Sequence, residues 1–181
     1  MMDLVFVTGN QAKADYLAQW LGRVVEHQKV DIDEIQSLDP IRVLQEKARS
    51  AYEIVQRPVL VEDVSLTFTA MGHLPGTLIK WFLEELGVEK LASLAQKLPD
   101  QHAVASITYG IFDGLKLVTF SGEAKGVIVP KPRGKSFGWN TIFMPDGFTK
   151  TYAEMTPEEF HTHSHRGIAL RKMQTYLKTL E

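Results

Sequence analysis

Short apolar blocks alternate with longer amphipathic segments in the first half of the chain, a pattern typical of strands that alternate with helices. The first block, residues 4–7, is apolar and β-branched and leads into the turn Thr8-Gly9-Asn10. Residues 12–21 then predict a helix that ends at Gly22. The following segments are predicted, in order, as a weak strand at 24–30, a helix at 41–55, strands at 59–61 and 66–70, a turn at 72–76, and helices at 77–86 and 88–98.

The second half of the chain predicts a hairpin and a final helix. Two strand-like runs between residues 103 and 129 flank Asp113-Gly114, a dipeptide that favours the tight turn of a β-hairpin. The tail from His163 to Leu180 predicts an amphipathic helix, with apolar residues at helical spacing at Ile168, Leu170, Met173, Tyr176 and Leu177. No repeat and no flexible linker divides the sequence. We therefore expect one domain of the α/β class, residues 1–181, whose mixed sheet combines parallel connections early with an antiparallel hairpin later.

Composition limits the classes of partner. The 181 residues are 44% hydrophobic and 23% charged, and no apolar run approaches the roughly 20 residues of a membrane span. The first four residues lack the features of a secretory signal, and the chain has no cysteine, so we expect a cytoplasmic protein without a membrane partner. The net charge of −2 provides no basic field for a nucleic-acid polymer. Any anionic ligand must therefore be held by a local site.

The turn Thr8-Gly9-Asn10 is the first candidate site, because a strand that leads through a glycine turn into a helix directs backbone N–H groups at one point. Lys13 lies in the first turn of this helix, where the helix dipole disfavours a cation unless an anion is bound there. That geometry suits phosphate. The alternative is an ordinary strand-to-helix turn, since the spacing matches neither a P-loop nor the dinucleotide fingerprint.

Adjacent carboxylates at Glu62-Asp63 form the second candidate. They directly follow the apolar strand predicted at 59–61, and open α/β sheets place ligands at the carboxyl ends of such strands. Carboxylate oxygens suit Mg²⁺, and the acidic pair Asp33-Glu34 offers a further ligand from a neighbouring connection. The alternative is a solvated strand end with surface carboxylates.

Two later segments carry groups that bind nucleotides. In the segment 133–140, two glycines and two aromatic residues interleave with basic residues and an amide, the components of a base-binding pocket. Ser164-His165-Arg166 places a hydroxyl, an imidazole and a guanidinium near the start of the last helix. The alternatives are a glycine-rich loop with buried rings and a capped helix start. A zinc site at His161, His163 and His165 is disfavoured, because no cysteine or carboxylate at ligand spacing completes the set.

Six short motifs in order resemble the inosine triphosphate pyrophosphatase family, which hydrolyses deaminated purine triphosphates such as those of inosine and xanthosine. The motifs are Phe6-Val7-Thr8-Gly9-Asn10 with Lys13, Leu60-Val61-Glu62-Asp63, Leu74-Pro75-Gly76 with Ile79-Lys80-Trp81-Phe82, Phe137-Gly138-Trp139, Thr151-Tyr152-Ala153-Glu154-Met155, and Ser164-His165-Arg166. The resemblance extends from Val5 to about Leu177, and several motifs look like the eukaryotic branch.

The resemblance implies a long, curved mixed sheet that forms the floor of a cleft between two α/β lobes, in a chain that pairs as a homodimer. It implies Mg²⁺ as the cofactor and a nucleoside triphosphate as the substrate. Water would attack the α-phosphorus and pyrophosphate would leave, a displacement catalysed mainly by positioning and by cations that neutralise the phosphate oxygens.

By the same resemblance, four residues are expected to grip the triphosphate: Thr8, Asn10, Lys13 and Lys47. Glu34 and Asp63 fall at the family's metal-associated positions, with Glu62 as a further candidate metal ligand. Asp63 is the candidate to orient or deprotonate the attacking water, with Lys13 and Glu34 as the other catalytic candidates. The nucleotide cleft is expected to be lined by Lys80, Phe137, Trp139, Ser164, His165 and Arg166.

The chain departs from the family pattern at two places in the base pocket. Asn140 stands where the family carries an aspartate, and an amide both donates and accepts hydrogen bonds. Loss of the charged acceptor is expected to weaken recognition of the ring N–H of a deaminated purine by about 1–3 kcal/mol. Phe160-His161 stands where the family carries a Lys-Asn pair, which removes a positive charge near the nucleotide. The alternatives to the enzyme are therefore a homologue with altered base specificity and a nucleotide-binding protein with little hydrolytic activity.

Overall fold

The computed structural model describes residues 3–180. Its strands are β1 (Val5–Val7), β2 (Glu26–Gln28), β3 (Val59–Phe68), β4 (Pro75–Gly76), β5 (His102–Phe112), β6 (Leu117–Ile128) and β7 (Phe143–Pro145). Its helices are α1 (Gln11–Leu21), α2 (Pro40–Val55), α3 (Ile79–Gln96), α4 (Pro157–His163) and α5 (His165–Lys178), with short 3₁₀ turns η1 (Thr69–Met71), η2 (Gly138–Thr141) and η3 (Tyr152–Glu154). Within the described range, no helix is both long and apolar enough to cross a membrane.

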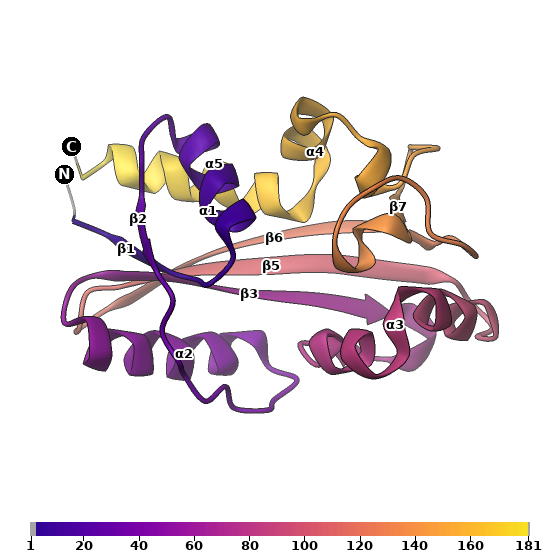
Figure 1. Cartoon of the computed structure of the whole chain (residues 1–181), viewed down its shortest axis with the longest axis horizontal. Coiled ribbons are helices and arrows are strands. Elements are labelled where there is room, and N and C mark those ends of the chain that lie inside the picture. The colour runs from indigo at the N-terminus through magenta and orange to yellow at the C-terminus, as the bar shows by residue number, and fades with distance from the viewer. Residues whose placement is uncertain (1–2, 181) are drawn as a thin grey trace. The chain divides into compact units, whose positions relative to one another are not determined.

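The strands form one mixed sheet, in the order β2-β1-β3-β5-β6-β7 with β4 beside β3 (Figure 1). Strand β1 runs parallel to both β2 and β3, whereas β4 is antiparallel to β3 and β7 is antiparallel to β6. The α/β class and the mixed sheet predicted from the sequence are confirmed.

The chain divides into two compact units. The first unit contains the residues up to Asp63, Thr108–Ser121 and the residues from Ala169; the second contains Val64–Ile107 and Gly122–Ile168. Strands β3, β5 and β6 each contribute residues to both units.

In the first unit, α2 covers one face of β1 and β3 while α1 and α5 cover the other (Figure 1). Helix α2 begins where Asp39 accepts hydrogen bonds from the backbone N–H groups of Ile41 and Arg42. Its buried face carries Leu44, Ala48 and Ala51 at helical spacing, and these residues pack against apolar side chains of β1 and β3. This packing places the residues just before and within α2 close to the middle of β3.

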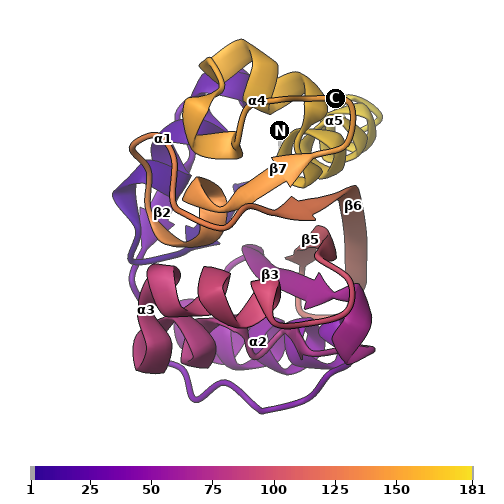
Figure 2. The same ribbon diagram turned by 90° about the vertical axis from the view of Figure 1, so that its right-hand side faces the viewer.

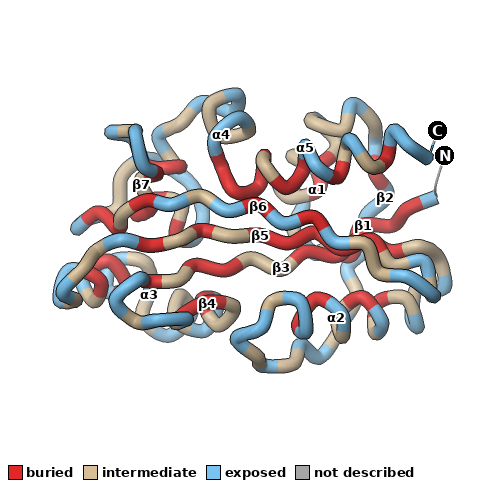
Figure 3. Tube along the Cα trace, turned by 180° about the vertical axis from the view of Figure 1, so that it is seen from behind, coloured by how far each residue is buried: buried red, intermediate tan, exposed pale blue. Residues whose placement is uncertain are grey.

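In the second unit, α3 lies on one face of the strands and α4 on the other (Figure 2). In the hydrophobic core of the second unit, Leu66 and Phe68 of β3 pack with Leu91 of α3, Phe143 of β7 and Trp139 of η2. The runs of buried residues along β3 and β5 are visible in Figure 3. The base-pocket candidates of the sequence therefore come from segments that surround this core.

Several predicted boundaries are confirmed and several are wrong. Helix α1 ends at Gly22 with φ 67°, and the hairpin turns at Gly114 with φ 96°. The strands predicted at 59–61 and 66–70 are one strand, β3, because the carboxylates between them are accommodated inside the strand. The helices predicted at 77–86 and 88–98 join into α3 across a break at Gly87, whose φ of 71° and ψ of 165° are not helical.

Helix α4 and strand β7 were not predicted from the sequence. Helix α4 begins with a capping box, in which the side chain of Thr156 accepts from the Glu159 N–H and the side chain of Glu159 accepts from the Thr156 N–H. Pro157 follows at the first helical position, so the signal for this helix start is present in the sequence. Strand β7 has only three residues, which is too short for periodicity to reveal.

Candidate active site

The turn between β1 and α1 is held by hydrogen bonds of its own. The Thr8 N–H donates to the Gln28 carbonyl at 3.0 Å, the Asn10 N–H to the Thr8 hydroxyl at 3.1 Å, and the Lys13 N–H to the Asn10 side-chain oxygen at 3.3 Å. These three N–H groups are therefore engaged within the protein rather than directed at a ligand. An anion at this site would instead be attracted by the positive N-terminal end of α1. The first helical turn of α1 has no acidic residue to oppose this attraction.

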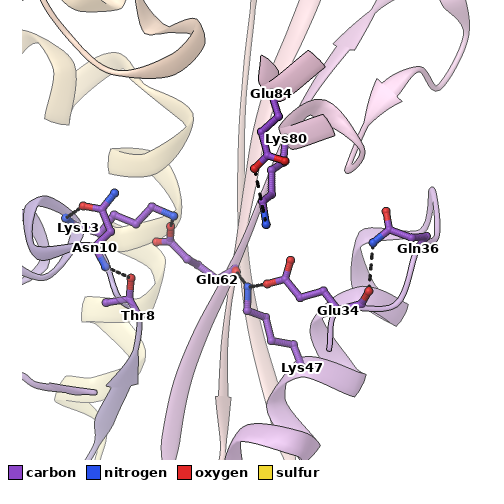
Figure 4. A network of polar contacts seen from close by, with 9 residues as sticks. All are labelled: Thr8, Asn10, Lys13, Glu34, Gln36, Lys47, Glu62, Lys80 and Glu84. Carbon is purple, nitrogen blue, oxygen red and sulfur yellow. Dashed lines mark hydrogen bonds and ion pairs between the residues drawn. The ribbon is translucent and has the colours of Figure 1, made fainter. Parts of the chain in front are cut away.

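Lys13 faces an anion within the protein. Its ammonium lies 2.7 Å from the Glu62 carboxylate, which is only 5% exposed (Figure 4). A buried carboxylate needs a partner of opposite charge, and a cation in the first turn of a helix is stabilised by an anion beside it. The pair therefore fixes Lys13 at the start of α1 and satisfies Glu62 in the middle of β3.

Lys47 of α2 reaches the same strand. Its ammonium donates to Glu34 at 2.5 Å and to the backbone carbonyl of Glu62 at 3.2 Å (Figure 4). Glu34 lies in the loop before α2, where the Gln36 side chain donates to its carbonyl at 3.1 Å. Two lysines from different helices are thus anchored around one point of β3.

Asp63 is next to Glu62 in β3, and successive side chains of a strand point to opposite faces of the sheet. Burial raises the pKa of the Asp63 carboxyl to about 7; the charge of Lys47 opposes this rise, and the charges of Glu34 and Glu62 add to it. Within the described residues, the buried Oδ2 of Asp63 has no hydrogen-bond partner. This oxygen of the Asp63 carboxyl group is therefore left for an external donor or cation.

The predicted position of the Glu62-Asp63 pair at a strand end is wrong, because β3 continues to Phe68. The strand tolerates two carboxylates in its interior because Lys13 pairs with one while the other is bordered by Lys47. In residues 3–180 no three His, Asp or Glu side chains are grouped as a metal site, so Glu34, Glu62 and Asp63 do not converge as a ready set of ligands.

The second unit gathers a buried aromatic cluster at the other candidate segments. The ring of Trp139 lies 5.3 Å from that of His165, and Tyr152 stacks on His165 at 5.6 Å. All three residues are buried, whereas Phe137 is 57% exposed. Of the two rings expected to stack on a base, only Phe137 therefore has an exposed face.

Ser164 and Gly167 shape the start of α5. The Ser164 hydroxyl accepts from the Gly167 N–H at 3.1 Å, so the capped-helix interpretation holds for this fully buried side chain. A Cβ on Gly167 would lie 1.6 Å from the His161 carbonyl oxygen, so only glycine fits there. His165 and Arg166 follow the cap and are buried.

Two histidines of the disfavoured zinc site, His163 and His165, have separate surroundings. The His163 ring packs on Phe148 at 4.8 Å, whereas His165 lies between Trp139 and Tyr152. Tyr152 is the member of this buried aromatic cluster that was not singled out from the sequence, although the capping box of Thr151 and Glu154 around it was a visible signal.

Asn140 and Lys80 lie closer to the surface of the second unit. The Asn140 amide donates to the Ser136 hydroxyl at 3.3 Å. Lys80 is exposed, pairs with Glu84 at 4.0 Å and lies over the ring of Trp81 at 5.3 Å. The structure thus collects Thr8, Asn10, Lys13, Glu34, Lys47, Glu62 and Asp63 in the first unit, and places the base-pocket candidates in the second.

Residues 4–176 match the sequence model of the Ham1 family. The inosine triphosphate pyrophosphatase of Yarrowia lipolytica is 39% identical over 183 residues, which cover 97% of this chain and 96% of that protein. The chain belongs to the Ham1 family. The resemblance noted in the sequence is therefore confirmed at the level of the family.

Solved structures share the fold of this chain. A HAM1 protein from Coxiella burnetii superimposes with a TM-score of 0.85 at 24% identity, covering 99% of this chain and all of that one. The nucleoside-triphosphatase, or dITP/XTP pyrophosphatase, of Mycobacterium abscessus gives a TM-score of 0.73 at 25% identity, covering 94% of this chain and 97% of that one.

Proposed function

We propose that this Ham1-family chain is a hydrolase that cleaves nucleoside triphosphates, preferentially those of deaminated purines, to the monophosphate and pyrophosphate. The names of two relatives support the reaction class: the Yarrowia protein is an inosine triphosphate pyrophosphatase and the Mycobacterium protein a dITP/XTP pyrophosphatase. The first is similar to this chain over almost its whole length.

Asp63 carries the proposal. A general base works best when its pKa lies near the operating pH, and burial brings the pKa of Asp63 to about 7. Its unpartnered Oδ2 is available to take a proton from the water that attacks the α-phosphorus. Proton removal by Asp63 strengthens the nucleophile at the moment when pyrophosphate leaves.

Lys13 and Lys47 are proposed to bind the phosphates. Both ammonium groups are held by carboxylates, at Glu62 and Glu34, and a lysine held in place loses less side-chain entropy when the anion arrives. Thr8 and Asn10 hold the turn at the start of α1, whose positive end also favours phosphate. Positioning and charge neutralisation are the main sources of rate in phosphoryl transfer.

Mg²⁺ is the proposed cofactor, and the residues present fit it. Burial and the nearby charges of Glu34 and Glu62 raise the pKa of Asp63, so a cation among these carboxylates would relieve their repulsion, and carboxylate oxygens are ligands that Mg²⁺ prefers. Asp63 and Glu34 would hold the ion. Glu62 would remain paired with Lys13 and position that lysine. When bound, the ion supplies positive charge to the phosphate oxygens.

The base is proposed to bind in the second unit, with Phe137 stacking on the purine and Asn140 at its edge. Lys80, Trp139, His165 and Arg166 are proposed as neighbouring residues, and Ser164 as the cap that positions the last two. Because the Asn140 side chain both donates and accepts, the alternative is a homologue with broader base choice. A second alternative, a nucleotide-binding protein with little turnover, also rests on this pocket.

Pyrophosphate release with Mg²⁺ tests the proposal directly. The assay compares the triphosphates of inosine, xanthosine, guanosine, adenosine and the pyrimidines. We expect the fastest release from the triphosphates of the deaminated purines. Release from all the triphosphates at similar rates would favour the homologue with broader specificity. Absence of release, together with measurable nucleotide binding by calorimetry, would replace the hydrolase with the nucleotide-binding protein.

The remaining expectations concern the whole chain. We propose that residues 1–181 form one two-lobed domain, because β3, β5 and β6 each supply residues to both units. Homodimer formation and a cytoplasmic location stay predictions from the resemblance and the composition.

A further inference from the structure

Gly9 lies beside Lys29, a residue outside the proposed triphosphate site. A Cβ built on Gly9 would lie 3.1 Å from both the Cγ and the Cδ of Lys29. The aliphatic stem of Lys29 therefore lies against the backbone of the Thr8-Gly9-Asn10 turn. Gly9 does not have a positive φ, so its lack of a side chain serves this contact rather than an unusual backbone conformation.

Strand pairing holds Lys29 in this position. Val7 of β1 pairs with Gln28 of β2, and the Gln28 carbonyl accepts from the Thr8 N–H at 3.0 Å. Lys29 is the first residue after β2. The pairing of β1 with β2 therefore places Lys29 beside the Thr8-Gly9-Asn10 turn.

The charge of Lys29 is available to a ligand. The ammonium groups of Lys13 and Lys47 pair with Glu62 and Glu34. Lys29, by contrast, is exposed, and within residues 3–180 its side chain makes no ion pair or hydrogen bond. Its ammonium is two covalent bonds beyond the Cδ, which lies 3.1 Å from the position of a Cβ on Gly9, and Gly9 directly precedes Asn10, the N-cap of α1.

We propose that Lys29 is a further triphosphate-binding residue, which lies over Gly9 and directs its ammonium to the anion at the start of α1. This inference rests on the proposed function for the identity of the anion. A lysine with an apolar stem packed on the backbone and a free charged end acts mainly on binding, because its charge meets phosphate in the ground state as well as during reaction. Lys29 is thus a determinant of KM more than of kcat.

Calorimetry with inorganic tripolyphosphate tests binding without requiring turnover, and KM and kcat are measured beside it for the nucleotide that releases most pyrophosphate. Lys29→Met keeps the stem and removes the charge; it is expected to weaken tripolyphosphate binding about tenfold and to raise KM with a smaller change in kcat. Lys29→Arg is expected to retain binding. Lys116→Met, on the exposed hairpin turn, is the matched control and is expected to bind as the parent does.

A double-mutant cycle tests the contact with Gly9. Gly9→Ala is expected to weaken binding in the parent, because the new methyl displaces the Lys29 stem, and to cost nothing further in a Lys29→Ala background. An equal cost of Gly9→Ala in both backgrounds would overturn the proposed packing.

Unchanged tripolyphosphate binding in Lys29→Met, or no tripolyphosphate binding by the parent, would overturn the role of Lys29. If the expected losses occur while no nucleotide releases pyrophosphate, the inference stands and the proposed hydrolysis fails.

Discussion

At the residue scale, two neighbouring acids in one strand have different surroundings. Glu62 has a lysine partner 2.7 Å away, whereas Asp63 keeps a buried oxygen without a partner within the described chain. An unsatisfied buried carboxylate costs stability and persists where function requires it. The same property that suits Asp63 to catalysis therefore makes it a source of instability.

Asp63→Asn is expected to remove most pyrophosphate release while leaving the protein folded, since an amide cannot take a proton from water. Steady-state assays measure the turnover. Asp31→Asn, an exposed acid of the same unit, is the control and is expected to retain activity. Near-normal turnover by Asp63→Asn would show that the catalytic assignment is wrong.

The same substitution is expected to change how stability depends on pH. The folded pKa of Asp63 is raised to about 7, above its usual value of 3.8, so the folded protein holds a proton that the unfolded chain has lost. The wild type therefore loses stability as pH rises between these two pKa values, by about 4 kcal/mol in total. In metal-free buffer, the Tm of Asp63→Asn minus the Tm of the wild type should increase as pH rises from 3.8 to about 7 and should be constant above that pH. An advantage that does not vary with pH would contradict the raised pKa.

Asn140→Asp is expected to raise the preference for inosine over adenosine triphosphate about tenfold, because a carboxylate accepts the ring N–H of inosine and adenosine has no hydrogen at that position. The ratio of the two kcat/KM values is measured, so that changes common to both substrates cancel. Thr149→Asp adds an exposed carboxylate elsewhere in the second unit and should leave the ratio unchanged. An unchanged ratio in Asn140→Asp would reject a role for residue 140 in base choice.

At the element scale, single residues set where helices start and break. The capping box at Thr156 and Glu159 starts α4, and Gly87 interrupts α3. Because Leu91, Ala92 and Ala95 after the break are buried, the bend determines how the second half of α3 meets the core.

Gly87→Ala is expected to lower the free energy of unfolding by about 1–3 kcal/mol, because a Cβ disfavours the conformation at φ 71° and ψ 165°. Open space surrounds the position, so a loss of stability would come from the backbone and not from a clash. Urea denaturation measures the change, with the exposed Ser93→Ala in the same helix as control. A Gly87→Ala protein as stable as the parent would mean that α3 straightens without cost.

At the scale of the whole molecule, β3, β5 and β6 contribute residues to both units. Breaking such a strand in one unit removes packing from the other, so the two units are expected to unfold together.

Single-tryptophan variants test this cooperativity. Trp20 lies in the first unit and Trp139 in the second, so variants that keep one or the other report on each unit separately. We expect their urea midpoints to coincide with each other and with the loss of helical circular dichroism. Two separate midpoints would contradict a single domain. Each variant is compared with its own circular dichroism curve, which controls for the effect of the substitutions on stability.

The sequence by itself determined the family, the α/β class and most of the elements. Local signals were sufficient there: glycine at residues 22 and 114 adopts the positive φ that a helix end and a hairpin turn require, and six short motifs in order identified the Ham1 relatives. Boundaries that depend on long-range pairing were less accessible, as in β3, where two predicted strands proved to be one.

Only the tertiary structure decided what each candidate side chain contacts. Glu62 and Asp63 are adjacent in sequence, yet Glu62 pairs with Lys13 of α1, whereas burial raises the pKa of Asp63 and the charge of Lys47 of α2 opposes that rise, because a strand alternates its side chains. The exposed Phe137 and the buried Trp139 are distinguished by the core around them. The contact between Gly9 and Lys29 joins two residues brought together by the pairing of β1 with β2. Such contacts depend on how elements pack, and no local pattern encodes them.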